Sequence, residues 1–206
     1  MARAPHEAPR KGRRLTGWQW VLEHPALLQY DDRLTFARGA DADAVFRACG
    51  LDPARAEMRT LEECVGPSGE TRDAPPCVRV AADDEWTAFL EINLVDVPLR
   101  QPGAVLSRDG EAAVFEYRWM GPHEVTYFRR GEFTFSYSPG ESYDTRAGRE
   151  PERFDPELRA AGLFPPPLSG DPLAEFVGTL ATLSRALGFT LTPEVARGAL
   201  PTARYG

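Results

Sequence analysis

The chain has 206 residues, of which 42% are hydrophobic and 27% are charged, and its net charge at neutral pH is −7. This length and composition suit a single globular domain that can bury a core of ordinary size. The acidic balance argues against nucleic acid or an anionic membrane as the main partner, because binding to phosphate groups requires a basic surface.

Cysteine usage argues against a metal site and a disulfide framework. Cys49, Cys64 and Cys77 are widely spaced, with no C-x-x-C pair and no histidine at ligand spacing. An odd number of scattered cysteines is typical of a reducing compartment. No apolar stretch reaches the length of a membrane span, and no secretory signal follows the N-terminus. We therefore expect a cytoplasmic protein with no metal, no cofactor and no membrane segment.

Residues 1–14 have no hydrophobic periodicity and carry four basic residues between positions 10 and 14. They contain no serine and no apolar face, so we expect a flexible basic leader rather than a transit peptide. Residues 15–206 are expected to form a single α+β domain. Its first element is a short helix that starts near Trp18 and ends before Pro25, because a proline disfavours helix in the residue preceding it.

Residues 34–36 predict a short strand, and a helix is expected directly after it. Asp41 suits the N-cap of that helix, and Gly50 lies where a glycine ends one. Asp52–Pro53 predicts a second helix that runs towards Cys64, since proline is favoured in the first turn after a capping residue.

Two further strands are predicted over residues 77–81 and 86–93, paired as a hairpin about an acidic turn. The strongest sheet signal follows at residues 111–138, where aromatic and β-branched residues alternate with polar ones in a three-stranded meander. Residues predicted to share the apolar face of this meander are Phe115, Tyr117, Trp119, Phe133, Phe135 and Tyr137.

The segments around and after the meander contain shorter elements. Residues 95–107 are expected to form a loop with one helical turn, because two prolines argue against a long helix. A short helix is predicted from Asp155, and an amphipathic helix over 171–187, where leucines recur at helical spacing before Gly188. A last short helix follows Thr192. The residues after position 200 are expected to be a loose tail.

Seven segments of the chain occur in the same order as similar segments in a known protein family. They are residues 34–39, 41–46, 86–93, 114–119, 133–137, 154–156 and 171–187. In this order they resemble a family of mostly actinobacterial proteins known only as a domain of unknown function. That family has an L-x-F/L-A/V-R-G strand before a D-x-x-x-V helix, then a W-T-x-x-x-E-x-N strand, an aromatic sheet segment, an F-D-P element and a Leu-rich helix. The resemblance implies a compact α+β domain and implies no activity, substrate or catalytic residue.

Four residues are candidates for a functional site. Glu116 and Arg118 are two positions apart on one predicted strand, so they share a face opposite the aromatic residues. If Glu91 joins them, two carboxylates and a guanidinium line one patch that suits an anion or a polar ligand. The simpler interpretation is a solvated sheet face with cross-strand charge pairs. His123, like His24, is a general base only if a carboxylate orients it, and a lone histidine is more often structural.

The sequence thus predicts an antiparallel sheet of about five or six strands with helices packed on one face. The first functional hypothesis is a small domain that binds a protein or a small polar ligand without catalysis. The alternative is a small enzyme that uses Glu91, Glu116 and Arg118 as an acid–base or anion-holding site. An enzyme predicts a pocket in which these side chains converge and a shifted pKa, whereas a protein-binding module predicts a broad exposed apolar surface.

Overall fold

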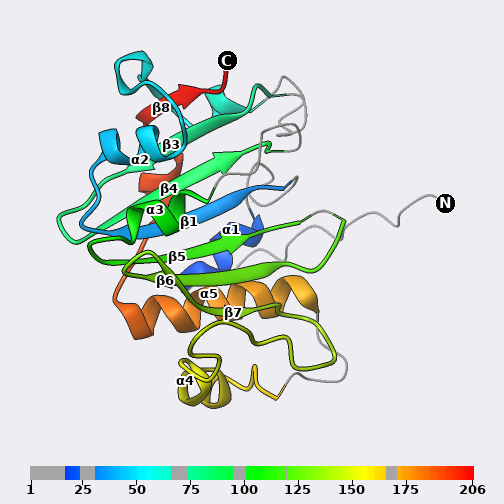
Figure 1. The fold of residues 1–206 in the computed structure, drawn as a ribbon. Coiled ribbons are helices and arrows are strands. Elements are labelled where there is room, and N and C mark those ends of the chain that lie inside the picture. Colours follow the sequence, from blue (N-terminus) through cyan, green and yellow to red (C-terminus); the bar gives the residue numbers. More distant parts are fainter. Residues whose placement is uncertain (1–16, 24–30, 66–73, 95–100, 119, 166–170) are drawn as a thin grey trace.

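The computed structural model describes residues 17–23, 31–65, 74–94, 101–118, 120–165 and 171–206. At its centre lies one eight-stranded antiparallel sheet in the order β2-β8-β3-β4-β1-β5-β6-β7 (Figure 1). The strands are β1 (Arg33–Arg38), β2 (Glu57–Arg59), β3 (Cys77–Ala81), β4 (Trp86–Ile92), β5 (Glu111–Glu116), β6 (Glu124–Arg129), β7 (Glu132–Tyr137) and β8 (Leu200–Arg204). The α+β class is confirmed, and the predicted number of strands is too low.

The two strands that the sequence analysis missed lie together at one edge of the sheet. β8 pairs with β2 on one side and with β3 on the other. The helix expected to run towards Cys64 is wrong: two single 3-10 turns, Pro53–Arg55 and Glu62–Cys64, flank β2 instead. Short strands such as these are stabilised by partners far away in the sequence, and no local periodicity encodes such pairing.

One face of the sheet, here called the α5 face, carries the larger core. It is covered by α1 (Trp20–Glu23), α4 (Asp155–Ala160), α5 (Pro172–Leu187) and α6 (Pro193–Arg197). Aromatic rings fill the layer between sheet and helix; the ring centroids of Phe36 and Phe189 lie 4.0 Å apart. The caps of α5 are as predicted: Asp171 accepts a hydrogen bond from Leu173 N, and Gly188 adopts a φ of 83°. No helix among the described residues is long and apolar enough to cross a membrane.

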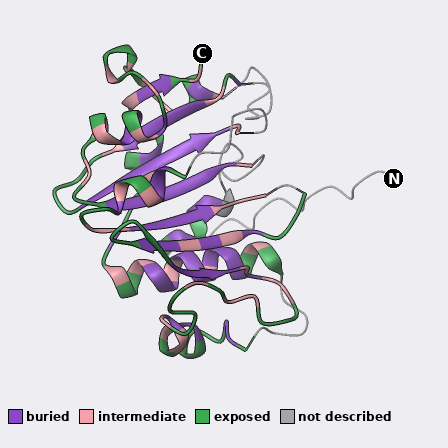
Figure 2. Ribbon diagram, viewed as in Figure 1, coloured by how far each residue is buried: buried purple, intermediate pink, exposed green. Residues whose placement is uncertain are grey.

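The opposite face, here called the α3 face, carries α2 (Ala42–Ala48) and α3 (Pro102–Leu106), so the expectation of helices on one face is wrong. Val45 and Phe46 of α2 form a second core with Val78 and Phe89 of the sheet. The physical reason is visible in β4, in which every residue is buried (Figure 2). A strand that is buried on both sides, with Phe89 packed on the α3 face, requires cover on both sides.

A β-bulge corrects the predicted face of Phe133. Tyr127 pairs with Phe135 and Phe128 pairs with Phe133, so β7 has one residue more than β6 at this point. Phe135 and Tyr137 are buried as expected. Phe133 instead lies beside Phe128 on the α3 face, with the ring centroids 6.2 Å apart, and is 45% exposed.

Candidate functional site

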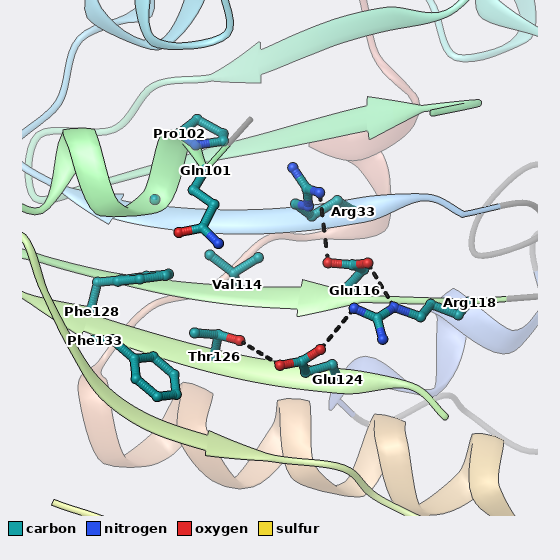
Figure 3. Close-up of a pocket in the computed structure, with 11 residues that line it drawn as sticks. Arg33, Gln101, Pro102, Val114, Glu116, Arg118, Glu124, Thr126, Phe128 and Phe133 are labelled. Atoms are coloured by element: carbon teal, nitrogen blue, oxygen red, sulfur yellow. Dashed lines mark hydrogen bonds and ion pairs between the residues drawn. The ribbon is translucent and has the colours of Figure 1, made fainter. Parts of the chain in front are cut away.

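A pocket of about 420 Å³ lies on the α3 face, between α3 and strands β1, β5, β6 and β7 (Figure 3). Its lining combines apolar and charged side chains. The lining residues are Arg33, Gln101, Pro102, Gly103, Val114, Glu116, Arg118, Glu124, Thr126, Phe128 and Phe133.

Strand register brings these residues together. Val114 lies opposite Thr126, and Glu116 lies opposite Glu124, so alternate residues of β5 and β6 form the floor. The helix α3 forms one wall and approaches the floor closely at Gly103. A Cβ atom there would lie 2.6 Å from Cγ2 of Val114, so only glycine fits this approach without a shift of the valine.

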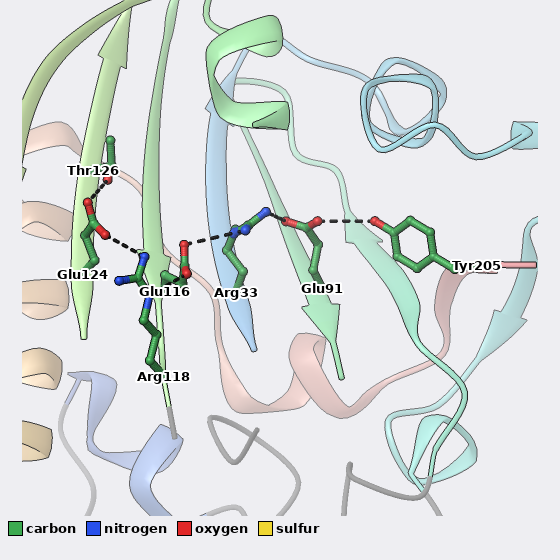
Figure 4. A network of polar contacts seen from close by, with 7 residues as sticks. All are labelled: Arg33, Glu91, Glu116, Arg118, Glu124, Thr126 and Tyr205. Atoms are coloured by element: carbon green, nitrogen blue, oxygen red, sulfur yellow. Dashed lines mark hydrogen bonds and ion pairs between the residues drawn. The ribbon is translucent and has the colours of Figure 1, made fainter. Parts of the chain in front are cut away.

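Charged side chains form a row across four strands, here called the charged row: Glu124, Arg118, Glu116, Arg33 and Glu91 (Figure 4). Arg118 donates from Nε to Glu116 and from Nη2 to Glu124, both at 2.8 Å. Arg33 donates from Nη1 to Glu91 at 3.1 Å, and its Nη2 lies 3.6 Å from Glu116. At the far end, the Tyr205 hydroxyl donates to Glu91 at 3.4 Å.

The row passes from solvent into the interior. The Arg118 and Glu124 side chains are 37% and 32% exposed, whereas those of Arg33 and Glu91 are 8% and 2% exposed. Burial raises the pKa of Glu91, and the charge and hydrogen bond of Arg33 oppose that rise. Partial burial alone would lower the pKa of Arg118, but hydrogen bonds and charges of Glu116 and Glu124 raise it above its ordinary value. A ligand in the pocket can therefore meet the outer part of the row and Arg33, but not Glu91.

The structure brings three of the four predicted candidates into one network. Glu116 and Arg118 line the pocket and contact each other. Glu91 joins them only through Arg33, and it is 1% exposed. The expectation of a solvated face is therefore wrong at Glu91, because the residue after β8, Tyr205, lies against this carboxylate.

His123 lies on the α5 face, away from these three residues. Its ring stacks on Tyr117 with centroids 4.6 Å apart, and it lies 5.2 Å from the ring of Phe176 in α5. Its Nδ1 accepts a hydrogen bond from the backbone N–H of Arg118. Burial lowers the pKa of His123, against the charge of Asp171. These contacts are those of a packed structural histidine. His24 and Trp119 lie outside the described residues.

Sequence reasoning missed most of the pocket. Glu124, Thr126 and Phe128 alternate along β6, a signal that was present in the sequence; with the register of the meander it places Glu124 opposite Glu116. Arg33 precedes the predicted first strand by one residue, and nothing local indicates that β1 separates β4 from β5.

A separate buried group lies at the other end of the sheet. Arg79 is fully buried and donates to the backbone carbonyls of Arg59, Ala196 and Gly198 at 2.7–3.2 Å. Near it, a hydrogen bond with Cys77 lowers the pKa of the Cys64 thiol to about 7, although burial opposes this shift. The sequence spacing of these cysteines gave no indication that they are neighbours. Among the described residues, no group of three or more His, Cys, Asp or Glu side chains is arranged to hold a metal ion.

Comparisons of the chain with protein-family models, with curated proteins and with solved structures found no match. The resemblance to the actinobacterial family therefore stays a prediction from the sequence.

Proposed function

We propose that this protein is a cytoplasmic ligand-binding domain that holds a small molecule in the pocket on its α3 face, without catalysis. The observation that carries the proposal is the pocket itself. Its volume of about 420 Å³ lies in the usual range of small-molecule sites, about 300–1,000 Å³. Two phenylalanine rings face a row of ionised groups across it, the combination that gives a small ligand both contact area and orientation.

The distribution of exposed apolar residues favours a small ligand over a protein partner. Among the described residues, the exposed large apolar side chains are Met58, Val105, Met120, Phe133, Tyr143 and Val195. Met58 in β2 and Phe133 in β7 lie at opposite edges of the sheet, and Val105 in α3 and Val195 in α6 lie on opposite faces. A protein-binding face would require a contiguous apolar patch. Of these residues, Phe133 lines the pocket, where a bound molecule would cover its ring.

The position of Glu91 supports binding rather than acid–base chemistry. Burial raises the pKa of Glu91, which is the property expected of a catalytic acid. However, Glu91 lies behind Arg33 and is not part of the pocket lining. A cytoplasmic location is supported by the cysteines, all of which are free thiols and fit a reducing compartment.

A thermal-shift screen of metabolites against three proteins tests the proposal. The proteins are the wild type, Glu116→Ala in the pocket, and Asp43→Ala as a matched control, since Asp43 pairs with Arg47 on the exposed surface of α2. A ligand at 100 times its Kd stabilises the folded state by about 2.7 kcal/mol. We expect a metabolite that raises the melting temperature of the wild type and the control but not that of Glu116→Ala. A screen without any stabilising compound, or with compounds that act equally on all three proteins, contradicts the proposal.

A further inference from the structure

The pocket has two chemically different halves, and each restricts what binds there. One half is apolar, formed by Pro102, Val114, Phe128 and Phe133. The other half is polar and is formed by Arg33, Glu116, Arg118 and Glu124 of the charged row together with Gln101 and Thr126. A ligand that fills both halves needs an apolar body and a polar or charged group at one end.

The charged row beside the pocket has a net negative charge. Arg33 and Glu91 are buried and form an ion pair with each other at 3.1 Å, so their charges offset. The other three members, Glu116, Arg118 and Glu124, are two carboxylates against one guanidinium, so the charged row as a whole has a net charge of −1. The net charge of the whole chain, −7, has the same sign and attracts cations over a longer range.

The hydrogen bonds of Arg118 disfavour an anion. Its Nε and Nη2 groups already donate to Glu116 and Glu124 at 2.8 Å, so an anionic ligand must compete with both carboxylates for them. A cation competes with Arg118 for Oε1 of Glu116 and for Oε2 of Glu124, but not for the second oxygen of Glu124. The Oε1 atom of Glu124 accepts only a long contact of 3.5 Å, from the Thr126 hydroxyl, among the described residues. It therefore retains most of its capacity to accept from an ammonium or guanidinium group.

The aromatic residues add to the same preference. Phe128 and Phe133 lie side by side with their rings tilted by 56°, and Phe133 is 45% exposed. An aromatic face attracts a cation placed over it, by about 0.5–2 kcal/mol depending on how far the cation is desolvated. The same rings supply contact area to an apolar body.

We infer that the pocket takes a small organic cation, namely an ammonium or guanidinium group carried on an apolar body, with the charge against Glu124 and Glu116 and the body against Phe128 and Phe133. This inference rests on the proposed function and adds the chemical class of the ligand. The contacts assign the two halves of such a molecule to two sets of residues, so each set has its own test.

The test is a titration with three probes that share a phenyl ring and differ in charge: 2-phenylethylammonium, 2-phenylethanol and 3-phenylpropanoate. Chemical shifts of the full-length protein give the affinity of each. We expect the cation to bind about tenfold more tightly than the alcohol, and the anion to bind more weakly than either. Added salt should weaken binding of the cation and leave that of the alcohol unchanged.

Two variants separate the halves of the pocket. Glu124→Gln should weaken binding of the cation about tenfold and leave binding of the alcohol unchanged, because the substitution removes the charge of the side chain without changing its shape. Phe133→Ala should weaken binding of all three probes, and that of the cation most, because the ring both contacts the apolar body and attracts the charge. Its half-exposed ring makes loss of folding unexpected. An alcohol that binds as well as the cation, an anion that binds more tightly, or a cation that does not bind overturns the inferred ligand class. The proposed function itself fails only if the metabolite screen also finds no stabilising compound, or finds only compounds that act equally on all three proteins.

Discussion

Arg33 lies between two carboxylates at the boundary between the pocket and the interior. Its guanidinium is 3.1 Å from Glu91 and 3.6 Å from Glu116, and its side chain is 8% exposed. Removing one partner of a buried ion pair leaves the other charge without compensation, which costs far more than the pair contributes in isolation. Arg33 therefore compensates the negative charge of the buried Glu91 carboxylate.

We expect Arg33→Met to lower the free energy of unfolding by about 3–5 kcal/mol at neutral pH. The loss should shrink as the pH falls. Burial already raises the pKa of Glu91, and without Arg33 the pKa should rise further. Above the ordinary pKa of a glutamate, the folded state then holds a proton that the unfolded chain releases, so stability falls with rising pH. Urea unfolding between pH 5 and about pH 8 measures this.

The double variant Arg33→Met with Glu91→Gln is the matched control for this experiment. It removes both charges and keeps the shape of the carboxyl group, so most of the stability should return and its additional pH dependence should disappear. A single variant that loses the same free energy at every pH would show that the lost packing of the arginine, not the uncompensated charge, causes the effect.

At the scale of elements, Arg146 joins the loop after β7 to helix α4. It binds Asp144 within the loop through Nε and Nη2, binds Asp155 in the first turn of α4, and lies over the ring of Phe164 at 3.8 Å. Its side chain is 12% exposed. These contacts connect the loop after β7 to α4, although no hydrophobic pattern in the sequence links these two segments.

The carboxyl group of Asp144 should make this junction sensitive to acid. Hydrogen bonds from Arg146 lower the pKa of Asp144 from 3.8 to about 2. Because the folded-state pKa lies below that of the unfolded chain, the contribution of Asp144 is fully present above pH 3.8 and is lost as the pH falls towards 2. We expect Asp144→Asn to destabilise the protein at pH 6 and to have a diminishing effect below pH 4, measured by urea midpoints. In an Arg146→Met background, the substitution should have little effect at any pH; a full effect there would contradict the assignment.

Elements with local signals could be predicted from the sequence. The caps at Asp41, Asp171 and Thr192 each accept a backbone hydrogen bond at the predicted helix start. Alternation in β4 and β5 placed Glu91, Glu116 and the aromatic residues on the correct faces.

The errors arose where distant partners decide the structure. β8 has few strand-forming residues and is held between β2 and β3. The bulge opposite Phe128 moved Phe133 into the pocket, and the burial of Glu91 depends on Tyr205, more than a hundred residues away. Three of the five residues of the charged row, Glu91, Glu116 and Arg118, were therefore predictable from the alternation of residues along the strands, whereas the depth at which Glu91 is buried was not.

At the scale of the whole molecule, Arg79 ties three separate segments to β3. Its guanidinium donates to backbone carbonyls in β2, in α6 and in the turn before β8. Burial lowers the pKa of Arg79, which indicates how strongly the surroundings disfavour its charge. Such an arginine persists because its donors satisfy carbonyl groups that would otherwise be buried without partners.

We expect Arg79→Met to lower the free energy of unfolding by about 3–5 kcal/mol, and Arg79→Lys to lower it nearly as much, because one ammonium cannot match the planar geometry of three bonds. Arg129→Lys, at an exposed position of β6, is the control and should change stability by less than about 0.5 kcal/mol. Chemical denaturation gives all three values. A lysine variant as stable as the wild type would mean that a positive charge is enough at this position and that the planar arrangement of the guanidinium donors is not needed.

The position of β8 has a consequence for how the protein is made. Synthesis proceeds from the N-terminus, so β8 leaves the ribosome after all the other described strands, yet it belongs between two of the early ones. Until it arrives, β3 presents a row of unpaired backbone groups, and such open edges recruit strands from other chains. A nascent chain that folds before β8 emerges would therefore leave one inner position of its sheet vacant, and a chaperone would matter most at that stage.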